Sequence, residues 1–577
     1  MTEDKKLTGY PSIDKPWLKY YSEEAINASL PECTIYEYLW ENNKNYPHDI
    51  ALVYFSSKVS YHQLFKNIEK TAKSFTALGV KPHDIVTVAL PSIPEALYCV
   101  YALNRIGAVA NMIHPLAGEK EIIHYLNEVK SEVAVIFDGT YKIIEKSMGQ
   151  TSVKHAVVVS AGCSMPFGMK QLYGLKNGKE NFAEKSVYMY WEQFIKNGRN
   201  TKAAFMYKDS REMAIISHTG GTTGDPKGVM CSDRNANALM HEIVCNFQYN
   251  RQGVSLVVLP PFVNYSLIEA MMAMLAIGYK VVLIPDYQPL KFANYIRKYR
   301  PNIILSIPAY WEAILKIDNI LSTDMSCFEQ IYAGGEAMSK ESEQAVNQIL
   351  LSCGSKTSLL KGLGSTEMTG GATQTYTNCN IPGSVGIPLV KMECKVVSPQ
   401  DNTELGYCQD GEICFAGETV MLGYYNNESA TNEIIQQHSD GKRWLHTGDM
   451  GYIDKDGVIF VTGRIKRIYM TKGQDQQVTK LFPDRIEKAI CSHPAVKLCC
   501  VVGIPDEKRI HIPIAFVVLK HEYQQSEQIK EEIIRTCRDL LPEYMVPERI
   551  KFCKSLPRTE RGKVDYRALE ERAIGSK

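Results

Sequence analysis

Two hydrophobic patterns alternate along the first two thirds of the chain. Apolar residues recur every three or four positions from Leu64 to Leu78, which predicts a helix, and the largely apolar run Ile85–Leu90 predicts a buried strand. Similar helix patterns follow at Glu119–Val129 and Ser339–Leu351. Further strands are predicted at Val133–Phe137, Ala156–Ser160, Met213–Ser217, Ser255–Pro260, Lys280–Ile284, Asn302–Ile307 and Gln330–Gly334. This alternation favours an α/β fold with parallel sheets covered by helices.

The pattern changes after Thr377. Short strand patterns lie among Gly, Pro and Asp residues at Cys394–Val397 and Gly411–Phe415, and Asp454–Gly457 separates two apolar runs as a hairpin turn would. Beyond this hairpin we expect a smaller α+β unit, separated from the rest of the chain at Gly463–Lys466. Its predicted elements are a helix beginning at Asp484, strands Leu498–Val502 and Ile514–Leu519, and a helix Ser526–Leu540.

Composition narrows the function mainly by exclusion. The 577 residues carry 65 Lys and Arg against 64 Asp and Glu, so charge gives no argument for binding nucleic acid or an anionic membrane. The charged first residues lack the apolar segment of a secretory signal, and no apolar run approaches the ~18 residues of a membrane span. We therefore expect a cytoplasmic protein without a transmembrane segment, whose 16 scattered cysteines are reduced packing residues.

The most informative segment is Ser217–Met230, which reads S-H-T-G-G-T-T-G-D-P-K-G-V-M. Its glycines let backbone N–H groups approach an anion closely, its threonines add hydroxyl donors, and Lys227 adds a positive charge. No Ser or Thr follows the lysine, so the segment is not the common nucleotide P-loop. It predicts a polyphosphate-binding loop at the C-terminal end of a strand, with a flexible surface turn as the alternative.

Four later positions carry candidate chemistry. Glu367 follows the glycine-rich run G-L-G-S-T and offers Mg²⁺ a carboxylate, although Thr-Glu also begins ordinary helices. Asp449, at the end of H-T-G-D, suits ribose hydroxyls, and Arg464 suits ribose or phosphate; a turn aspartate and a solvated arginine are the alternatives. Lys563 lies in the polar run P-R-T-E-R-G-K, where a single lysine is ordinarily a surface charge.

In this order, the five elements closely resemble those of the adenylate-forming superfamily, which includes acyl-CoA synthetases, adenylation domains of nonribosomal peptide synthetases and beetle luciferases. The loop after Ser217 resembles the family signature T-S-G-T-T-G-x-P-K-G, and the resemblance covers nearly the whole chain. It implies an N-terminal AMP-binding domain over residues 1–463, with parallel helix-covered sheets and a small β-barrel-like subdomain. A hinge at residues 464–466 and a mobile α+β lid domain over residues 467–577 are also implied.

Members of this superfamily attack the α-phosphate of ATP with a substrate carboxylate, which yields an acyl-adenylate and pyrophosphate. A thiol, either coenzyme A or the phosphopantetheine of a carrier protein, then displaces AMP. The resemblance therefore implies ATP, Mg²⁺, a small carboxylic acid and one of these thiols as ligands. Because a carboxylate must approach a polyanion, cations and hydrogen-bond donors have to offset the charge as the new bond forms.

The resemblance also implies a role for each matching residue. Phosphate contacts fall to Thr219, Gly220, Gly221, Thr222, Thr223, Gly224 and Lys227. These residues would hold the β- and γ-phosphates. The adenine contacts fall to Gly335, Glu336, Ala337, Leu363 and Gly364. Thr366 would contact the α-phosphate, and Asp449 with Arg464 would contact the ribose. Glu367 would hold Mg²⁺, and Lys466 would be the hinge. Lys563 would bridge the carboxylate and the α-phosphate, acting in catalysis together with Thr366 and Lys227.

The chain departs from the family pattern near the adenine and near the thiol. Leu363 stands where the family usually has a tyrosine that packs on adenine, and leucine still offers apolar contact. After the hinge the chain reads K-G-Q-D-Q-Q-V-T-K-L-F-P-D-R-I-E, which is longer than the family pattern. In relatives this loop lies on the thiol-binding side. The departure therefore bears on which thiol accepts the acyl group, and not on the adenylation step.

The predicted acyl pocket includes Val263, Asn264 and Tyr265. Val263 stands where many CoA ligases have histidine, and Asn264 is the nearest counterpart of the aspartate that pairs with the ammonium in amino-acid-activating relatives. A neutral amide disfavours a plain α-amino acid. The run V-N-Y-S-L also resembles H-N-Y-P-L of aryl-acid-activating enzymes. We expect an ATP-dependent acid–CoA ligase for a fatty or other aliphatic acid; the alternative is a stand-alone enzyme that loads an aromatic or other acid onto a carrier protein.

Overall fold

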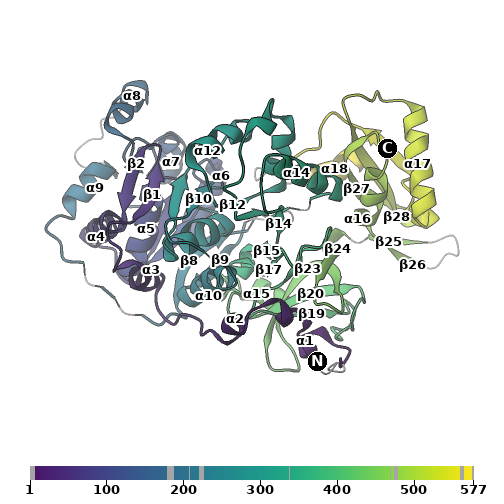
Figure 1. The fold of residues 1–577 in the computed structure, drawn as a ribbon, viewed down its shortest axis with the longest axis horizontal. Helices are drawn as coiled ribbons and strands as arrows, with labels where there is room; N and C mark the ends of the chain where they lie inside the picture. Colours follow the sequence, from purple (N-terminus) through teal and green to yellow (C-terminus); the bar gives the residue numbers. More distant parts are fainter. Residues whose placement is uncertain are drawn as a thin grey trace.

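The computed structural model arranges the chain as a large N-terminal body with a small C-terminal unit at one end of it (Figure 1). The body contains two large sheets surrounded by helices and a smaller antiparallel sheet close to the N-terminus. The structure describes residues 7–177, 187–203, 205–206, 208–219, 226–247, 249–336, 338–467, 469–472, 478–558 and 564–574. Within these residues, we find no helix with the length and apolar character needed to cross a membrane.

The first large sheet has eight strands in the order β21-β9-β8-β4-β3-β5-β6-β7. Neighbours from β8 to β7 run parallel, whereas β9 and β21 are added antiparallel at one edge. The parallel strands are largely buried, which explains why their sequences are almost continuously apolar. The strands are β3 (Ile85–Ala89), β4 (Val109–Met112), β5 (Val133–Phe137), β6 (His155–Val159), β7 (Tyr188–Tyr190), β8 (Met213–His218), β9 (Gly228–Ser232) and β21 (Gly423–Tyr424).

The second large sheet has seven strands in the order β14-β13-β12-β10-β11-β1-β2, and only the β1–β2 hairpin is antiparallel. Its strands are β1 (Ile50–Tyr54), β2 (Ser57–Ser60), β10 (Val254–Val257), β11 (Lys280–Leu283), β12 (Ile303–Ser306), β13 (Gln330–Ala333) and β14 (Leu360–Lys361). Because β13 and β14 are parallel neighbours, the segments that follow them leave the sheet at the same edge.

Helices cover these two sheets and bury a shared hydrophobic core. The α-helices of the body are α1 (Pro11–Asp14), α2 (Glu23–Asn27), α3 (Ile35–Asn43), α4 (Tyr61–Ala77), α5 (Pro94–Arg105), α6 (Glu119–Glu128), α7 (Tyr141–Met148), α8 (Phe167–Asn177), α9 (Trp191–Asn197), α10 (Asp233–Val244), α11 (Met274–Ala276), α12 (Phe292–Tyr299), α13 (Pro308–Ala313), α14 (Lys340–Ser352) and α15 (Glu428–Ile434). Helix α4 begins at a capping box, in which Ser60 and Gln63 exchange side-chain-to-backbone hydrogen bonds. A π-helix, Tyr265–Ala273, precedes α11.

The smaller antiparallel sheet has the order β19-β20-β23-β22, and β24 also pairs with β23. Its strands are β19 (Glu393–Val397), β20 (Gly411–Ala416), β22 (Ile435–Gln437), β23 (Arg443–Ile453) and β24 (Ile459–Arg464). Two short ladders lie between this sheet and the large ones in sequence. They pair β15 (Gly364–Ser365) with β16 (Gly370–Gly371) and β17 (Thr373–Gln374) with β18 (Ile387–Pro388).

The C-terminal unit contains a three-stranded sheet, β27-β28-β29, with helices on both faces. Helices α16 and α17 pack on one face and α18 on the other. The elements of this unit are β25 (Tyr469–Lys472), β26 (Val478–Leu481), α16 (Pro483–Cys491), β27 (Val496–Asp506), β28 (Ile510–Leu519), α17 (Glu527–Leu540), β29 (Arg549–Phe552) and α18 (Tyr566–Ile574).

The α/β class predicted from the hydrophobic pattern is confirmed, with a large N-terminal part and a small C-terminal part. Each predicted strand and helix overlaps an observed one, including the hairpin β23–β24 around Asp454–Gly457. The connection after β8 differs from the helical connections between the parallel strands. The segment after the strand Met213–His218 returns as antiparallel β9 instead of passing into a helix.

Candidate active site

The predicted phosphate loop connects β8 to β9 as a hairpin. The backbone N–H of Thr219 donates to the Lys227 carbonyl oxygen (3.0 Å), and the backbone N–H of Lys227 donates to Thr219 Oγ1 (3.1 Å). Because β8 is parallel to β4, the loop leaves the sheet at the edge where α/β folds place ligands. The predicted phosphate contacts that lie outside the described residues are those of Gly220, Gly221, Thr222, Thr223 and Gly224.

One carboxylate from α6 holds the base of this loop. Glu128 Oε1 accepts a hydrogen bond from the Gly228 backbone N–H (3.1 Å), and Glu128 Oε2 lies 3.4 Å from Nδ1 of the buried His218. The other ring nitrogen of His218, Nε2, lies 2.7 Å from Asn111 Oδ1 on β4. Burial raises the pKa of the Glu128 carboxyl. The two strand ends that carry the loop are thus fixed to the same helix.

Lys227, Tyr424 and Glu367 meet beside the loop, although they come from three distant segments. The Lys227 ammonium lies 5.1 Å from the centre of the Tyr424 ring, and the Tyr424 hydroxyl donates to Glu367 Oε1 (2.8 Å). Burial and the Glu367 charge raise the Tyr424 pKa, so this hydroxyl keeps its proton. A single oriented carboxylate beside a phosphate loop fits Mg²⁺, which usually takes one or two protein carboxylates and substrate phosphate oxygens.

The chain before Glu367 requires glycine at Gly362 and Gly364, where a Cβ would meet a backbone oxygen. A Cβ on Gly364 would lie 2.3 Å from the Gly370 carbonyl oxygen across the β15–β16 ladder, so no larger residue fits without backbone movement. Thr366 follows in a short 3₁₀-helix, Thr366–Met368, that also carries Glu367. The Leu363 side chain is half-buried and packs against the main core.

The predicted adenine segment lies next to this one at the same sheet edge. Gly335 and Glu336 follow β13, and the segment Gly362–Glu367 follows the parallel neighbour β14. Gly335 has a φ of +83°, a left-handed conformation that favours glycine. Ala337 lies outside the described residues. The topology therefore brings together two segments that the sequence assigned to one nucleotide.

The two predicted ribose residues face each other across the β23–β24 ladder. Asp449 and Arg464 are register partners, and Arg464 Nε lies 2.6 Å from Asp449 Oδ1. Asp449 is buried, whereas the Arg464 side chain is exposed and also donates from Nη1 to the Thr447 carbonyl oxygen (3.3 Å). The carboxylate is therefore held in a fixed orientation by the guanidinium.

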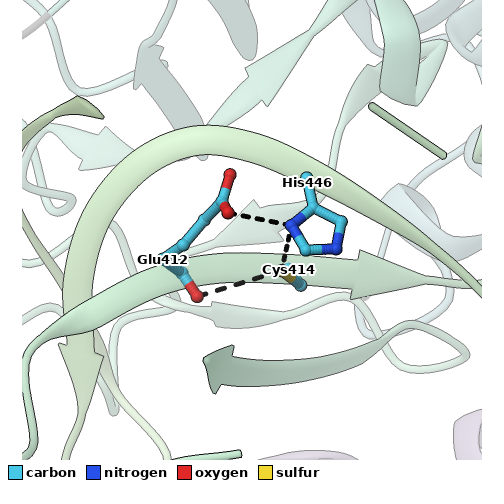
Figure 2. A group of neighbouring side chains, drawn as sticks. All are labelled: Glu412, Cys414 and His446. Carbon is cyan, nitrogen blue, oxygen red and sulfur yellow. Dashed lines mark hydrogen bonds and ion pairs between the residues drawn. The ribbon is translucent and has the colours of Figure 1, made fainter. Parts of the chain in front are cut away.

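Glu412, Cys414 and His446 form a buried polar cluster near the turn before Asp449, and Figure 2 shows how these three side chains lie. Glu412 Oε1 accepts from the Gly448 backbone N–H (2.9 Å), and Glu412 Oε2 lies 2.8 Å from His446 Nδ1. Cys414 Sγ lies 3.6 Å from the same nitrogen. By residue type, Glu412, Cys414 and His446 form a possible metal-binding group. Because both Glu412 oxygens already have protein partners, we interpret the cluster as support for the Gly448–Asp449 turn.

The predicted hinge lysine follows the last strand of the smaller antiparallel sheet. Strand β24 ends at Arg464, and Lys466 lies in the 3₁₀-helix Ile465–Arg467, but its side chain is outside the described part of the structure. Lys563 also lies outside the described residues. Their assigned roles remain predictions.

The predicted acyl segment begins the π-helix and runs back into the core. Val263 is partly exposed, Tyr265 is largely enclosed, and Asn264 is buried. Asn264 Oδ1 accepts a hydrogen bond from the Ser217 hydroxyl on β8, and its Nδ2 lies 3.7 Å from Cys231 Sγ on β9. The Asn264 amide therefore links the acyl segment to the strands that carry the phosphate loop.

Glu269, four residues after Tyr265 on the π-helix, also lies in this region and was not predicted from the sequence. Its Oε1 accepts from the Gly371 backbone N–H (2.8 Å), next to the glycines that follow Glu367. Burial raises the pKa of the Glu269 carboxyl to about 8, so the group is mainly uncharged at neutral pH. The available sequence signal was a single acidic residue inside the apolar run S-L-I-E-A-M-M-A-M-L.

Comparison with known proteins decides the family. The sequence model of the AMP-binding enzyme family matches residues 39–425, and the model of the AMP-binding enzyme C-terminal domain matches residues 485–563. The chain belongs to the AMP-binding enzyme family. It is 27% identical to the long-chain-fatty-acid–CoA ligase of Bacillus subtilis (strain 168), over 96% of this chain and 98% of that protein. It is also 27% identical to the probable 4-coumarate–CoA ligase 1 of Dictyostelium discoideum, over 96% and 97% of the two chains.

Solved structures agree with this AMP-binding enzyme in fold. ATP-bound MatB from Rhodopseudomonas palustris matches with a TM-score of 0.80 at 20% identity, over 94% of this chain and 99% of that one. The anthranilate CoA ligase AuaEII in complex with anthranoyl-AMP matches with a TM-score of 0.78 at 21% identity, over 95% and 98% of the two chains. These likenesses establish the arrangement of a large N-terminal domain and a small C-terminal domain.

Several supporting residues of this AMP-binding enzyme were missed by sequence reasoning. They are Glu128, His218, Glu269, Glu412 and Tyr424. Each of them holds a predicted site segment through a contact with a residue far away in sequence. Only their partners in space give these residues a role.

Proposed function

We propose that this AMP-binding enzyme is an AMP-forming acyl-CoA synthetase that activates a carboxylic acid with ATP and transfers the acyl group to coenzyme A. The contact among Lys227, Tyr424 and Glu367 carries the proposal, because it places a cation and an oriented carboxylate beside the phosphate loop. The names of the related CoA ligases support the same reaction class.

In the first half-reaction, a carboxylate oxygen of the acid attacks the α-phosphorus of ATP, and pyrophosphate leaves. Lys227 and the loop N–H groups offset charge on the departing phosphates, while Asp449 accepts hydrogen bonds from the ribose hydroxyls. Glu367 would hold Mg²⁺, which when bound neutralises phosphate charge. Thr366 contacts the α-phosphate, and Lys563 bridges it to the attacking carboxylate.

In the second half-reaction, the thiol sulfur of coenzyme A attacks the acyl carbonyl carbon, and AMP leaves. We assign residues 1–463 to the AMP-binding domain, 464–466 to the hinge and 467–577 to the lid. Rotation of the lid about this hinge lets one cleft serve both steps. Arg464 supports this division, because its side chain contacts Asp449 in the body while its backbone N–H donates to Asp484 of α16 (3.0 Å).

For the acid, we propose an aliphatic chain without an α-amino group. The Asn264 amide, which the aryl-acid pattern would direct to a ring hydroxyl, is bonded to Ser217 instead. Glu269 is mainly uncharged below pH 8, so it supplies no fixed anion for a substrate ammonium. The Asn264 contact and the uncharged state of Glu269 support a neutral acyl group over a hydroxylated aromatic acid or an amino acid.

The test is pyrophosphate release and thioester formation with a panel of C2 to C16 fatty acids, benzoates, cinnamates and α-amino acids. We expect ATP-dependent pyrophosphate release and acyl-CoA with one length range of the aliphatic acids. Absence of pyrophosphate release with every acid would refute the adenylation. Parallel reactions with free CoA and with a phosphopantetheinylated carrier protein identify the acceptor, and thioester on the carrier alone would refute the CoA assignment.

A further inference from the structure

Two cysteines of the C-terminal unit are in direct contact. Cys491 is the last residue of α16, and Cys499 lies on β27, to which α16 is joined by a short turn. Their sulfur atoms are 3.4 Å apart. In the described residues we find no second hydrogen-bonded pair of cysteine sulfur atoms among the 16 free cysteines. The contact is therefore a specific feature of this helix–strand corner.

The two thiols differ in access and in acidity. Cys491 is exposed to solvent, whereas Cys499 is buried and its Sγ lies 3.4 Å from the Glu487 carbonyl oxygen. The hydrogen bond between the two thiols lowers the pKa of Cys491 and raises the pKa of Cys499. Because the thiolate is the reactive form, Cys491 is the sulfur that an oxidant meets first.

We propose that Cys491 and Cys499 are a redox modification site that closes to an intramolecular disulfide when the enzyme meets hydrogen peroxide. The Cys491 thiolate attacks one peroxide oxygen and becomes a sulfenic acid, and the other oxygen leaves as hydroxide and takes up a proton. The Cys499 sulfur then attacks the Cys491 sulfur, loses its proton, and water leaves. Two thiols and one peroxide thus give one disulfide and two waters.

The site lies next to contacts that organise the predicted hinge. Glu487 of α16 accepts from the Val501 backbone N–H on β27 (2.7 Å) and pairs with Arg467, the last residue of the 3₁₀-helix after Arg464. A disulfide would therefore fasten α16 to β27 beside the Glu487–Arg467 ion pair. This inference does not depend on the proposed acyl-CoA synthesis.

Peptide mapping of the full-length protein tests the site. The native enzyme is treated with hydrogen peroxide, alkylated, and digested with trypsin, which cuts after Lys497 and so separates the two cysteines. We expect the peptide with Cys491 linked to the peptide that contains Cys499 and Cys500, with a mass lower by two hydrogen atoms. Treatment with a dithiol before alkylation should remove the link.

Single variants assign the partner. Cys499→Ser should abolish the link and leave Cys491 as a sulfenic acid, which is trapped by dimedone. Cys500→Ser is the matched control, since Cys500 lies in the same peptide on the same strand, and it should retain the link. Cys491→Ser should also abolish the link. Because Cys491 is exposed, this variant can be tested even if Cys499→Ser fails to fold. A Cys491 link that persists in Cys499→Ser, a disulfide between two molecules, or oxidation of the exposed Cys408 without any Cys491 link would overturn the proposal.

Discussion

Replacing Tyr424 with phenylalanine removes one hydroxyl from the site and leaves the ring beneath Lys227 in place. The hydroxyl donates to Glu367 Oε1 at 2.8 Å, so the variant loses the contact that orients the proposed magnesium-binding carboxylate. The ring contact with the ammonium, at 5.1 Å from the ring centre, is retained. Tyr424→Phe therefore separates the orientation of Glu367 from the position of Lys227.

The size of the effect follows from the type of bond. A hydrogen bond to a charged group contributes about 1.5–3 kcal/mol. Glu367 is half-buried, so water can partly replace the lost donor, and we expect a cost at the lower end of this range. At about 1.4 kcal/mol for each tenfold change, the Mg²⁺ concentration for half-maximal pyrophosphate release should rise about tenfold. The rate at saturating Mg²⁺ should be largely restored.

The assay is a Mg²⁺ titration of pyrophosphate release at saturating ATP and acid. Tyr425→Phe is the matched control, because it removes a hydroxyl from the neighbouring residue and should leave the titration unchanged. If Tyr424→Phe lowers the rate equally at all Mg²⁺ concentrations, Tyr424 does not act through the metal. If neither variant differs from the wild type, the contact has no role in the reaction.

Three further predictions concern the lid, the ribose turn and the core. Lys563→Ala should abolish adenylation but leave thioester formation from supplied acyl-adenylate largely intact; equal loss in both half-reactions would contradict its role. Glu412→Gln should weaken the hold on Gly448 and raise the KM for ATP several-fold, with a smaller change in kcat. Burial raises the pKa of Glu242 to about 8, so the contribution of this group to folding stability is full below pH 4.5 and falls by up to about 1.4 kcal/mol per pH unit towards pH 8. Glu242→Gln should remove this dependence, so its thermal midpoint should rise relative to wild type between pH 5 and 8.

Most of the architecture follows from local sequence patterns. Parallel strands such as β5 and β13 are largely buried, so they appear as short apolar runs, and amphipathic helices such as α4 and α6 separate them. The order of the strands in each sheet does not follow from these patterns. β8, for example, lies between β4 and β9, and in this order the base of the phosphate loop contacts Glu128 of α6.

The site was predictable where one segment carries the chemistry and not where several segments share it. The loop around Lys227 has its glycines and threonines in one run, so the sequence indicates phosphate binding directly. The role of Tyr424 depends on the pairing of β21 with β9, which brings the tyrosine to Lys227 across a long stretch of chain. The same reason applies to Asn264: its hydrogen bond from the Ser217 hydroxyl on β8 joins two segments that lie far apart in the chain.

The first residue of the predicted hinge and the residue directly after the hinge are both arginines, and each is fixed to a different part of the protein. Arg464 is attached to the body through Asp449, and Arg467 is attached to the small unit through Asp484 and Glu487 of α16. Only Ile465 and Lys466 lie between these anchors, so a rotation that preserves both sets of ion pairs must change the backbone dihedrals there. The hydrogen bond from the Arg464 backbone N–H to Asp484 crosses this point and would have to break. The ion pairs therefore support a pivot at residues 464–466, with one backbone hydrogen bond opposing the movement.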